Sequence, residues 1–387
     1  MNTLTKETLT SWANDPAAPV AVHLKQKLTS VECINDDDRC IIYPPTYADI
    51  GYNIDTLSDG KKVALVDSVG SQANRMEPVF KSTSEKPEDW LVPQIQIALG
   101  KDTKDTKATR LSLLDLAHRG ADAVVQSSGQ LAKDIRAAFS KLRETGDAAP
   151  LCAIAPTSLV FGVWDSRGSS SEKRPRLIRS VIRAWDVEVL HAAAQFNSVW
   201  KELDEKQRKE LQDEAKKQKK KLSVKGFADA PATFRDTKAA QYVGGAPNPE
   251  ARVLGGVLVH GGIERTVTIN LVALRGLQGA NKDETKSLRT YLLSLALIAA
   301  TSEIDLFLRE GCHLRFTGDD RWFSVPRRGN PIEVDLGGEA AGIFNTAAKD
   351  GAKQFRTKWP KEMNYTFDVA EAKKLLAAKE EDEQPES

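Results

Sequence analysis

The chain has 387 residues, with 55 basic and 54 acidic side chains and a formal net charge of +1. A charge this close to zero excludes a protein that attracts nucleic acid through its overall field, so an electrostatic binding surface must be local. The four cysteines are scattered and show no zinc-type spacing, so neither a disulfide framework nor a metal site is indicated, and no cofactor is expected.

The two ends and the apolar runs contain no membrane or export signal. The N-terminus lacks the basic start and apolar run of a signal peptide, and the longest apolar run, residues 292–300, is about half the length that spans a bilayer. We therefore expect a cytoplasmic protein without a membrane partner. At roughly 150 residues per domain the length allows two or three domains, although one elaborated domain fits as well.

The first 80 residues contain one clear strand-to-helix unit. Residues 1–60 are expected to form an irregular region with a short strand at CIIYPP, which the two prolines end. Val63–Val66 form an apolar strand, followed by a turn at Gly70 and a helix that has Ser71 as its predicted N-cap and ends at Pro78. A helix start reached through a glycine directs backbone N–H groups at one spot, which favours anions.

The middle of the chain alternates predicted helices and strands. Residues 113–124 and 131–142 carry apolar residues at helical spacing, and residues 151–164 look like a strand region broken by Pro156. The pattern at 176–190 fits either a helix or a strand, and its β-branched and aromatic residues favour a strand. Residues 200–250 are strongly charged and loop-like, which predicts an insertion with a solvated helix.

The last third is the most apolar part of the chain. Gly261 and Gly262 separate two β-rich runs and predict a hairpin turn. A long apolar helix is expected to begin near Asp283 and to stop at Gly311, and residues 313–325 predict another strand. The acidic tail, residues 376–387, is expected to be disordered. Strand-helix units mixed with hairpins predict an α+β fold, an antiparallel sheet with helices on one face.

No catalytic template is present. The phosphate-binding, dinucleotide-binding, metalloprotease and serine-hydrolase motifs are all absent. Asp115 and His118 could share one face of the predicted helix, which would allow a carboxylate-oriented base, but such pairs are more often surface salt bridges. The acidic runs at residues 36–38 and 319–320 could bind a metal ion, and the basic run at residues 216–221 could contact nucleic acid, but runs of like charge are more often solvated surface.

Arginines concentrate at one place. Five of them fall within seventeen positions: Arg167, Arg174, Arg176, Arg179 and Arg183. Guanidinium groups pair bidentately with phosphate, so the cluster suits a polyanion, but pairing with acids elsewhere in this balanced chain is equally compatible with the sequence. Two further segments carry basic residues, Arg75 at a predicted helix start and Arg265 and Arg275 on and after the predicted hairpin. Three separate basic segments favour an extended binding surface over a single pocket.

Five motifs in order resemble one known family. They are GSQANRMEPVF, TRLSLLDLAHRGADAVVQSS, PTSLVFGVWDSRG with RPRLIRSVIRAWDV, LSVKGFADAPA and GGVLVHGGIERTVTINLVAL. Together they resemble the RAMP-superfamily backbone protein of type I CRISPR surveillance complexes (Cascade), in subtype I-G, formerly I-U. The resemblance runs from about residue 38 to residue 325.

This resemblance implies a fold and a role. The fold would be a single elaborated domain over residues 1–387, a modified RRM (ferredoxin-like) antiparallel-sheet palm with inserted finger-like and thumb-like elements, and residues 200–250 would be an insertion. The role would be a structural, non-enzymatic subunit that polymerises along the CRISPR RNA and presents it for pairing with target DNA in antiviral defence. The implied partners are further copies of the chain, a large subunit, a fused end-capping and processing subunit, and a recruited helicase-nuclease.

The resemblance also implies residues that contact the guide RNA. Four would hold phosphates at the helix start, namely Ser71, Gln72, Asn74 and Arg75. His118 and Arg119 belong to the same expected set. The five clustered arginines would border the guide, and Arg265 and Arg275 would act from the hairpin. Two alternatives stay open: an endoribonuclease that uses an acid from residues 36–38 or Asp165, and a single-stranded nucleic-acid binder that works alone.

Overall fold

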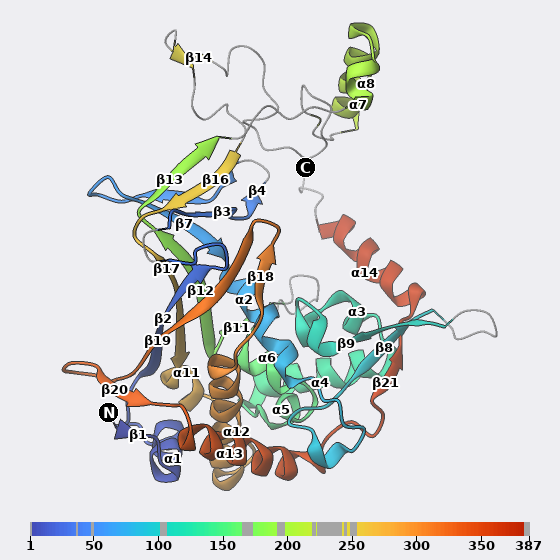
Figure 1. Ribbon diagram of the computed structural model, residues 1–387. Helices are drawn as coiled ribbons and strands as arrows, with labels where there is room; N and C mark the ends of the chain where they lie inside the picture. The colour runs from blue at the N-terminus through green and yellow to red at the C-terminus, as the bar shows by residue number, and fades with distance from the viewer. Residues whose placement is uncertain are drawn as a thin grey trace.

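The computed structural model describes residues 2–35, 38–47, 50–100, 107–164, 173–191, 198–218, 222, 242–243, 246–247 and 254–382. Their main feature is a curled nine-stranded sheet with helices packed against one side (Figure 1). The α+β class predicted from the sequence is confirmed. No helix within the described ranges combines the length and the apolarity needed to cross a membrane.

The large sheet is antiparallel except at one edge. Its strands, in spatial order, are β1 (Asn2–Thr3), β20 (Ile332–Asp335), β19 (Cys312–Val325), β2 (Ala21–Ser30), β17 (Ile263–Asn270), β12 (Ile178–Trp185), β7 (Lys62–Asp67) and β6 (Ile54–Thr56), with β18 (Leu306–Arg309) on β19. The parallel pair is β1 with β20. The longest strands, β2 and β19, pair along their length, so residues from the two ends of the chain form the middle of the sheet.

Helices from three parts of the chain cover one face of this sheet. They are α1 (Lys6–Asn14), α2 (Val69–Met76), α4 (Gly129–Thr145), α5 (Ala149–Ile154), α6 (Pro156–Val160), α11 (Leu271–Arg275), α12 (Lys282–Thr301) and α13 (Glu339–Arg356). The α12 helix is buried along its second half, from Tyr291 to Ala300, because it lies between the sheet and other helices. One apolar core therefore joins the sheet to the helical layer.

Smaller elements extend from this core. Two three-stranded sheets are formed by β13 (Val187–His191), β16 (Leu254–Val259) and β3 (Cys40–Ile42), and by β21 (Asn364–Thr366), β8 (Gln96–Leu99) and β9 (Thr109–Ser112). Two-stranded pairs are β4 (Thr46–Tyr47) with β5 (Gly51–Tyr52), β10 (Val163–Trp164) with β11 (Lys173–Arg174), and β14 (Tyr242–Val243) with β15 (Ala246–Pro247). The remaining helices are α3 (Ala123–Gln126), α7 (Ser198–Glu202), α8 (Glu205–Lys217) and α14 (Val369–Asp382), with short 3-10 turns at Glu77–Phe80, Pro87–Asp89, Leu113–Asp115 and Arg119–Ala121.

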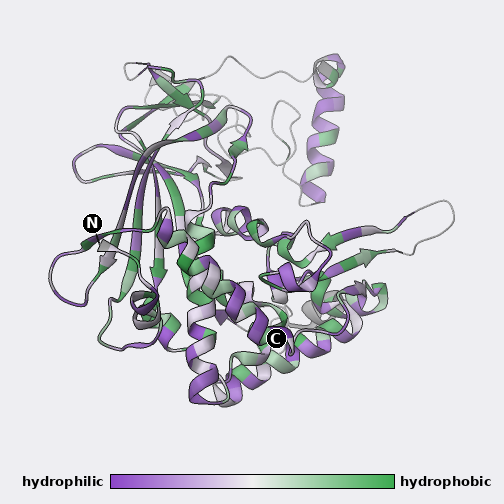
Figure 2. Cartoon of the chain, turned by 60° about the horizontal axis from the view of Figure 1, so that its bottom comes forward, coloured by the Kyte–Doolittle hydropathy of each residue, from purple (hydrophilic) through white to green (hydrophobic). Residues whose placement is uncertain are grey.

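Several predicted elements are confirmed. The strands at Val63–Val66 and 313–325 appear, and the strand interpretation of 176–190 is confirmed, although the chain there forms two strands, β12 and β13, in different sheets. The hairpin predicted at Gly261 and Gly262 is wrong. The strand before these glycines, β16, pairs with β13 and β3, whereas the strand after them, β17, pairs with β12 and β2, so the two strands lie in different sheets. The solvated helix predicted in the insertion is α8, which begins with a capping box at Asp204 and is hydrophilic along nearly its whole length (Figure 2).

Three other predictions were wrong. Residues 1–60 are not irregular, because α1 and β2 lie there; the alternation of β2 was overlooked. Residues 151–160 belong to α5 and α6, and only Val163–Trp164 are a strand, since Pro156 begins the second helix at its first position and does not break a strand. The predicted helix over 113–124 is two 3-10 turns and the short α3, so Asp115 and His118 do not share a helix face.

Two helix ends also differ from the predictions. The long helix stops at Thr301, and the chain turns at Ser302 into β18, so Gly311 belongs to the β18–β19 turn. The N-cap of α2 is Ser68, whose hydroxyl accepts the N–H of Ser71 at 3.2 Å. Serine is a favourable N-cap residue, so the residue type cannot distinguish Ser68 from Ser71, and only the backbone geometry does.

Two glycines of α13 give opposite predictions for the same substitution. A Cβ at Gly351 would lie 2.5 Å from the Cβ of Tyr291 on α12, whereas a Cβ at Gly342 would meet nothing within 4 Å. We expect Gly351→Ala to lower the free energy of unfolding by about 1–3 kcal/mol through overpacking. Gly342→Ala should raise it by about 0.5–1 kcal/mol, because alanine restricts the unfolded chain and favours helix. Urea denaturation of both variants measures this, and equal effects would contradict the packing of α12 on α13.

Candidate nucleic-acid interface

The face of the large sheet that the helices leave uncovered is the open face. Burial alternates along β2 and β17, with apolar residues such as Val22, Leu24 and Val267 on the helix side and polar residues on the other. Cross-strand partners share a face, so the register of the sheet defines which side chains lie together. Half-buried or exposed basic side chains on the open face are His23, Lys25, Lys27, Arg179, Arg183, Arg315 and Arg321.

Register places these side chains in rows across the sheet. One row runs from Arg179 through Thr268 and His23 to Phe323, and a second runs from Arg183 through Glu264 to Lys27. Between them, Lys25 lies directly opposite Arg321. Like charges directly opposite one another destabilise a sheet, and an external anion between them would remove that cost.

Some of these cations are already paired. The Nζ of Lys27 lies 2.6 Å from Asp319, and the Nε of Arg321 lies 3.0 Å from Glu333 while its guanidinium lies over the ring of Phe323 at 5.1 Å. Among the described residues, Lys25, Arg179 and Arg183 have no ion pair or side-chain hydrogen bond. These three cations lie on β2 and β12, with only β17 between them, and can accept phosphate without losing an internal partner.

His23 adds a neutral polar group to the same face. Its Nδ1 lies 2.9 Å from the hydroxyl of Thr268, and partial burial, followed by the charge of Lys25, lowers the pKa of the imidazole. The ring is therefore uncharged at neutral pH and contributes hydrogen bonding to the face, not charge.

The arginine cluster is divided between the open face and the segment that leads to it. Arg179 and Arg183 lie on the open face, and Arg176 is exposed just before β12. Arg174 lies in β11, and Arg167 is outside the described residues, as is Asp165. Gly162 lets this segment pass closely, since a Cβ there would lie 2.8 Å from both the carbonyl of Arg174 and the Cγ of Arg176.

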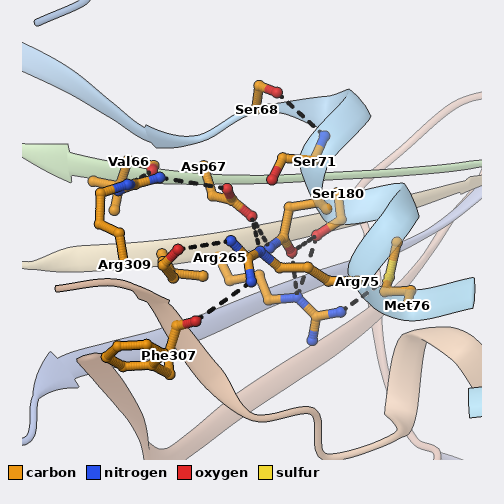
Figure 3. A network of polar contacts seen from close by, with 12 residues as sticks. Val66, Asp67, Ser68, Ser71, Arg75, Met76, Ser180, Arg265, Phe307 and Arg309 are labelled. Atoms are coloured by element: carbon orange, nitrogen blue, oxygen red, sulfur yellow. Dashed lines mark hydrogen bonds and ion pairs between the residues drawn. The ribbon is translucent and has the colours of Figure 1, made fainter. Parts of the chain in front are cut away.

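Two of the residues expected at the helix start lie in a buried polar network (Figure 3). The carboxylate of Asp67 accepts hydrogen bonds from Gln72 Nε2 at 2.7 Å and from Arg75 Nε at 3.1 Å. The Nη2 of Arg309 lies 3.9 Å from the same carboxylate. Arg75 also donates to the carbonyl of Leu308 at 3.0 Å. The network ties α2 to β7 and β18, so Gln72 and Arg75 have structural partners inside the protein.

Arg265 belongs to the same network, on the side of the sheet that the helices cover. It is 0% exposed, and its guanidinium donates to Gln72 and Ser180, both at 3.2 Å, and to Gln26 at 3.0 Å. Burial lowers the pKa of Arg265 to about 10, so the side chain is still charged at neutral pH. Arg265 has no surface with which to touch a guide RNA, contrary to its expected position.

The other expected residues around α2 also differ from one another in exposure. Ser71 is half-buried and gives its backbone N–H to the N-cap, while Asn74 is exposed and accepts from Arg119 Nη2 at 3.1 Å. His118 is exposed, with its backbone N–H directed at Asp122. Asp115, its expected partner, instead pairs with Lys81 at 2.6 Å. No catalytic pair is formed here.

Arg119 and Arg275 are structural in this molecule. Arg119 is 3% exposed and its Nε lies 2.7 Å from Glu77, which is 1% exposed. Arg275 donates to the backbone carbonyls of Trp12 and Pro19 at 2.8 and 2.9 Å, and so ties α11 to the end of α1 and to the loop after it. Neither guanidinium extends the open face.

The buried pair of Glu77 and Arg119 predicts a pH dependence. Burial raises the pKa of Glu77 to about 7, although the charge of Arg119 opposes the shift. Between its usual pKa near 4.5 and about 7, the folded state binds a proton that the unfolded state has lost, so stability falls as pH rises through this window.

We expect Glu77→Gln to remove this slope, which amounts to about 2 kcal/mol of unfolding free energy between pH 5.5 and pH 8. Urea denaturation at the two pH values measures it. Glu339→Gln, an exposed change on α13, should keep the wild-type slope. If Glu77→Gln and the wild type lose the same stability between the two pH values, the raised pKa is wrong.

Five of the seven basic side chains on the open face were not predicted from the sequence: His23, Lys25, Lys27, Arg315 and Arg321. Three of them lie on β2, where His23, Lys25 and Lys27 alternate with Val22, Leu24 and Gln26 in a strand pattern. That alternation was the available signal. Within the described residues no three His, Cys, Asp or Glu side chains are grouped so as to hold a metal ion.

Comparison with known proteins gives one family match. Residues 24–189 match the sequence model of the family described as CRISPR-associated protein GSU0053. The matched segment includes most of β2 and all of α2 and β12, and so contains the three unpaired cations Lys25, Arg179 and Arg183. No curated protein matches the chain.

Proposed function

We propose, because this chain is a CRISPR-associated protein of the GSU0053 type, that it is an RNA-binding backbone subunit of a type I surveillance complex. The open face is the surface that holds the CRISPR RNA, and the curled sheet corresponds to the modified RRM palm of such subunits. Copies of the chain would lie along one guide and would leave its bases open for pairing with a target DNA strand.

The unpaired cations of the open face carry this proposal. Lys25, Arg179 and Arg183 lie on neighbouring parts of one surface, without internal partners among the described residues. Cations held apart on a rigid sheet suit the phosphates of an extended single strand, which carry no sequence information. Base pairing then supplies the specificity, as in other RNA-guided complexes.

Aromatic rings on the same face support single-stranded RNA as the ligand. Trp185 is 36% exposed on β12, and Phe307 is 58% exposed on β18, edge to face with His313. Bases stack on such rings with little sequence preference. A surface that combines phosphate-binding cations with stacking groups favours nucleic acid over an acidic protein.

The proposed role includes no catalysis by this chain. Asp38, the one described acid of the run at 36–38, uses its carboxylate to accept the N–H groups of Ile34 and Asn35, at 2.7 and 2.8 Å. DNA cutting would fall to the recruited helicase-nuclease. Regular cleavage of complementary RNA by the pure protein, abolished by an Asp38→Ala change, would overturn this part of the proposal.

Co-purification tests the binding role. The protein is expressed with a CRISPR array and the neighbouring complex genes, purified through a high-salt wash, and its nucleic acid is run on a denaturing gel. We expect a discrete RNA of guide length. Protein that carries no RNA, or RNA of random length, would contradict the proposal. Arcs or filaments in negative-stain images whose length grows with the RNA would distinguish a backbone subunit from a lone binder.

A further inference from the structure

Two cysteines lie together where the large sheet meets the smaller sheet of β13, β16 and β3. Cys33 lies in the loop after β2, and Cys40 is the first residue of β3. Both line a pocket of about 380 Å³, with Thr29 and Arg315 in the same lining. Cys40 is a side-chain hydrogen-bond partner of Cys33, and both cysteines are free. Two reduced thiols therefore lie side by side.

Hydrogen bonds hold Cys33 against the large sheet. The backbone N–H of Val31 donates to the carbonyl of His313 at 3.0 Å, and Arg315 Nη2 donates to the carbonyl of Cys33 itself at 3.3 Å. His313 and Arg315 both belong to β19. The N–H of Cys33 also donates to the carbonyl of Ser30, the last residue of β2, at 3.1 Å. Cys33 is thus fixed to two strands of the large sheet.

Cys40 belongs to the smaller sheet. It pairs with Val259 of β16 in an antiparallel ladder that continues through Ile41 and Ile42. The β16 strand pairs in turn with β13. A covalent bond between Cys33 and Cys40 would therefore join the two sheets at one point, in addition to the loop of the chain between them.

The two thiols differ in their access to solvent. Cys40 is half-buried, whereas Cys33 is 7% exposed. Burial raises the pKa of the Cys33 thiol to about 11, and the hydrogen bond to Cys40 adds to the shift, so Cys33 stays protonated at neutral pH. The thiolate is the reactive form of cysteine, so Cys33 is not the thiol that an oxidant modifies first. Cys40 takes that place, with Cys33 beside it as the second thiol.

We propose that Cys33 and Cys40 are a redox-active pair that hydrogen peroxide converts into a disulfide. The sulfur of Cys40 attacks one oxygen of the peroxide, which forms an S–O bond and breaks the O–O bond, and the other oxygen leaves as water with the thiol proton. The sulfur of Cys33 then attacks the sulfenic sulfur of Cys40, the S–O bond breaks, and the oxygen leaves with the second thiol proton as a second water. Two thiols are oxidised and one peroxide is reduced.

The disulfide gives the redox state an effect on the fold. A dithiol can reverse it by thiol–disulfide exchange. While it is present, it closes a short loop and ties β3 to the end of β2, so local opening of the smaller sheet becomes rarer in the oxidised protein. This inference does not depend on RNA binding, and it stands or falls separately from the proposed function.

Trypsin separates the two cysteines, which allows a direct test. Cleavage after Lys27, Arg39 and Lys61 places Cys33 and Cys40 in different peptides. The full-length protein is treated with hydrogen peroxide, blocked with N-ethylmaleimide, digested without reductant and analysed by mass spectrometry. We expect these peptides as a linked pair, lighter than their sum by two hydrogen atoms, which dithiothreitol separates.

Single substitutions distinguish the two thiols. In Cys33→Ser the sulfenic acid on Cys40 has no thiol to attack it, so dimedone should label Cys40 several-fold more than in the wild type. Cys152→Ala, which changes a buried cysteine on α5, is the matched control and should give the same linked peptides as the wild type. Peroxide that leaves Cys33 as a thiol while Cys40 becomes a sulfinic acid, or that links Cys40 to a second molecule, would overturn the proposal.

Hydrogen exchange tests the effect on the smaller sheet. Amides of β3 and β16 should exchange at least about threefold more slowly in the oxidised than in the reduced wild type, because the disulfide opposes local opening. The same peroxide treatment of Cys33→Ser should leave their exchange unchanged. Equal exchange in the two states of the wild type would overturn the proposed tie between the sheets.

Discussion

Replacing Arg179 and Arg183 together with glutamate is expected to lower the affinity for single-stranded RNA by at least about 100-fold near 0.15 M salt. Each guanidinium would lose a charge-assisted hydrogen bond to phosphate, and the new carboxylates would repel the strand. The slope of log affinity against log salt should become shallower by about 1.4, since each phosphate contact with a single strand contributes about 0.7. Fluorescence anisotropy over a salt series measures both quantities.

The fold should tolerate this double change. Both side chains lie on the open face and have no partner among the described residues, so the only added cost is the like charge that Arg183→Glu places opposite Glu264. We expect the free energy of unfolding to fall by no more than about 1 kcal/mol.

The matched control makes the same change in charge on another surface. Lys133 and Lys349 are exposed on α4 and α13, away from the open face. Lys133→Glu with Lys349→Glu makes the same change in net charge and should leave the affinity within about threefold. Equal losses for both double variants would mean that net charge, and not the open face, determines binding. Loss of folding in the Arg179 and Arg183 variant would mean that the arginines are structural.

Replacing Asp67 with alanine is expected to destabilise the protein by about 3–5 kcal/mol. Asp67 is 1% exposed and is the carboxylate that both Arg75 and Arg309 face, with Gln72 bonded to it as well. Its removal leaves two part-buried guanidinium groups without their common counter-charge, next to the fully buried Arg265. Burial of charge without a partner is among the largest costs that a single substitution can cause.

Urea denaturation of Asp67→Ala and Asp67→Asn measures this cost. Asp67→Asn keeps the shape of the side chain and removes its charge. If electrostatics dominate, it should therefore lower the free energy of unfolding nearly as much as Asp67→Ala does. Asp55→Ala, an exposed change on β6 of the same sheet, should alter stability by less than about 0.5 kcal/mol. A stable Asp67→Asn variant would show that the hydrogen-bonded shape, and not the counter-charge, holds α2 on the sheet.

Local patterns in the sequence predicted much of the sheet. The apolar run at Val63–Val66 and the β-rich runs at 176–190 and after Gly262 predicted the strands Lys62–Asp67, Ile178–Trp185 and Ile263–Asn270, but not that 176–190 divides at Asp186 into two strands of different sheets. Where the pattern was short or contained proline, the prediction failed, as at α5 and α6. Apolar runs of this length fit a buried helix as well as a buried strand, and only packing decides between them.

Residue types identified cations but not their environment. Arg265 shares its strand parity with Ile263, Val267 and Ile269, so its place on the apolar side could have been inferred. No comparable pattern marked Arg119, because its burial depends on Glu77, which reaches it from a separate turn. Contacts between segments far apart in the chain leave no periodic trace in either segment.

The sequence by itself determined the α+β class, the family resemblance and the existence of an arginine-rich strand, since each depends on composition, periodicity or motif order along the chain. Only the tertiary structure decided which cations reach solvent without an internal partner among the described residues. Strand parity divides side chains between two faces, but the helical layer decides which face is covered, and the pairing of β2 with β19 brings Lys25 and Arg321 together. The same folding buries Arg265, leaves Arg179 exposed and leaves Arg183 half-buried.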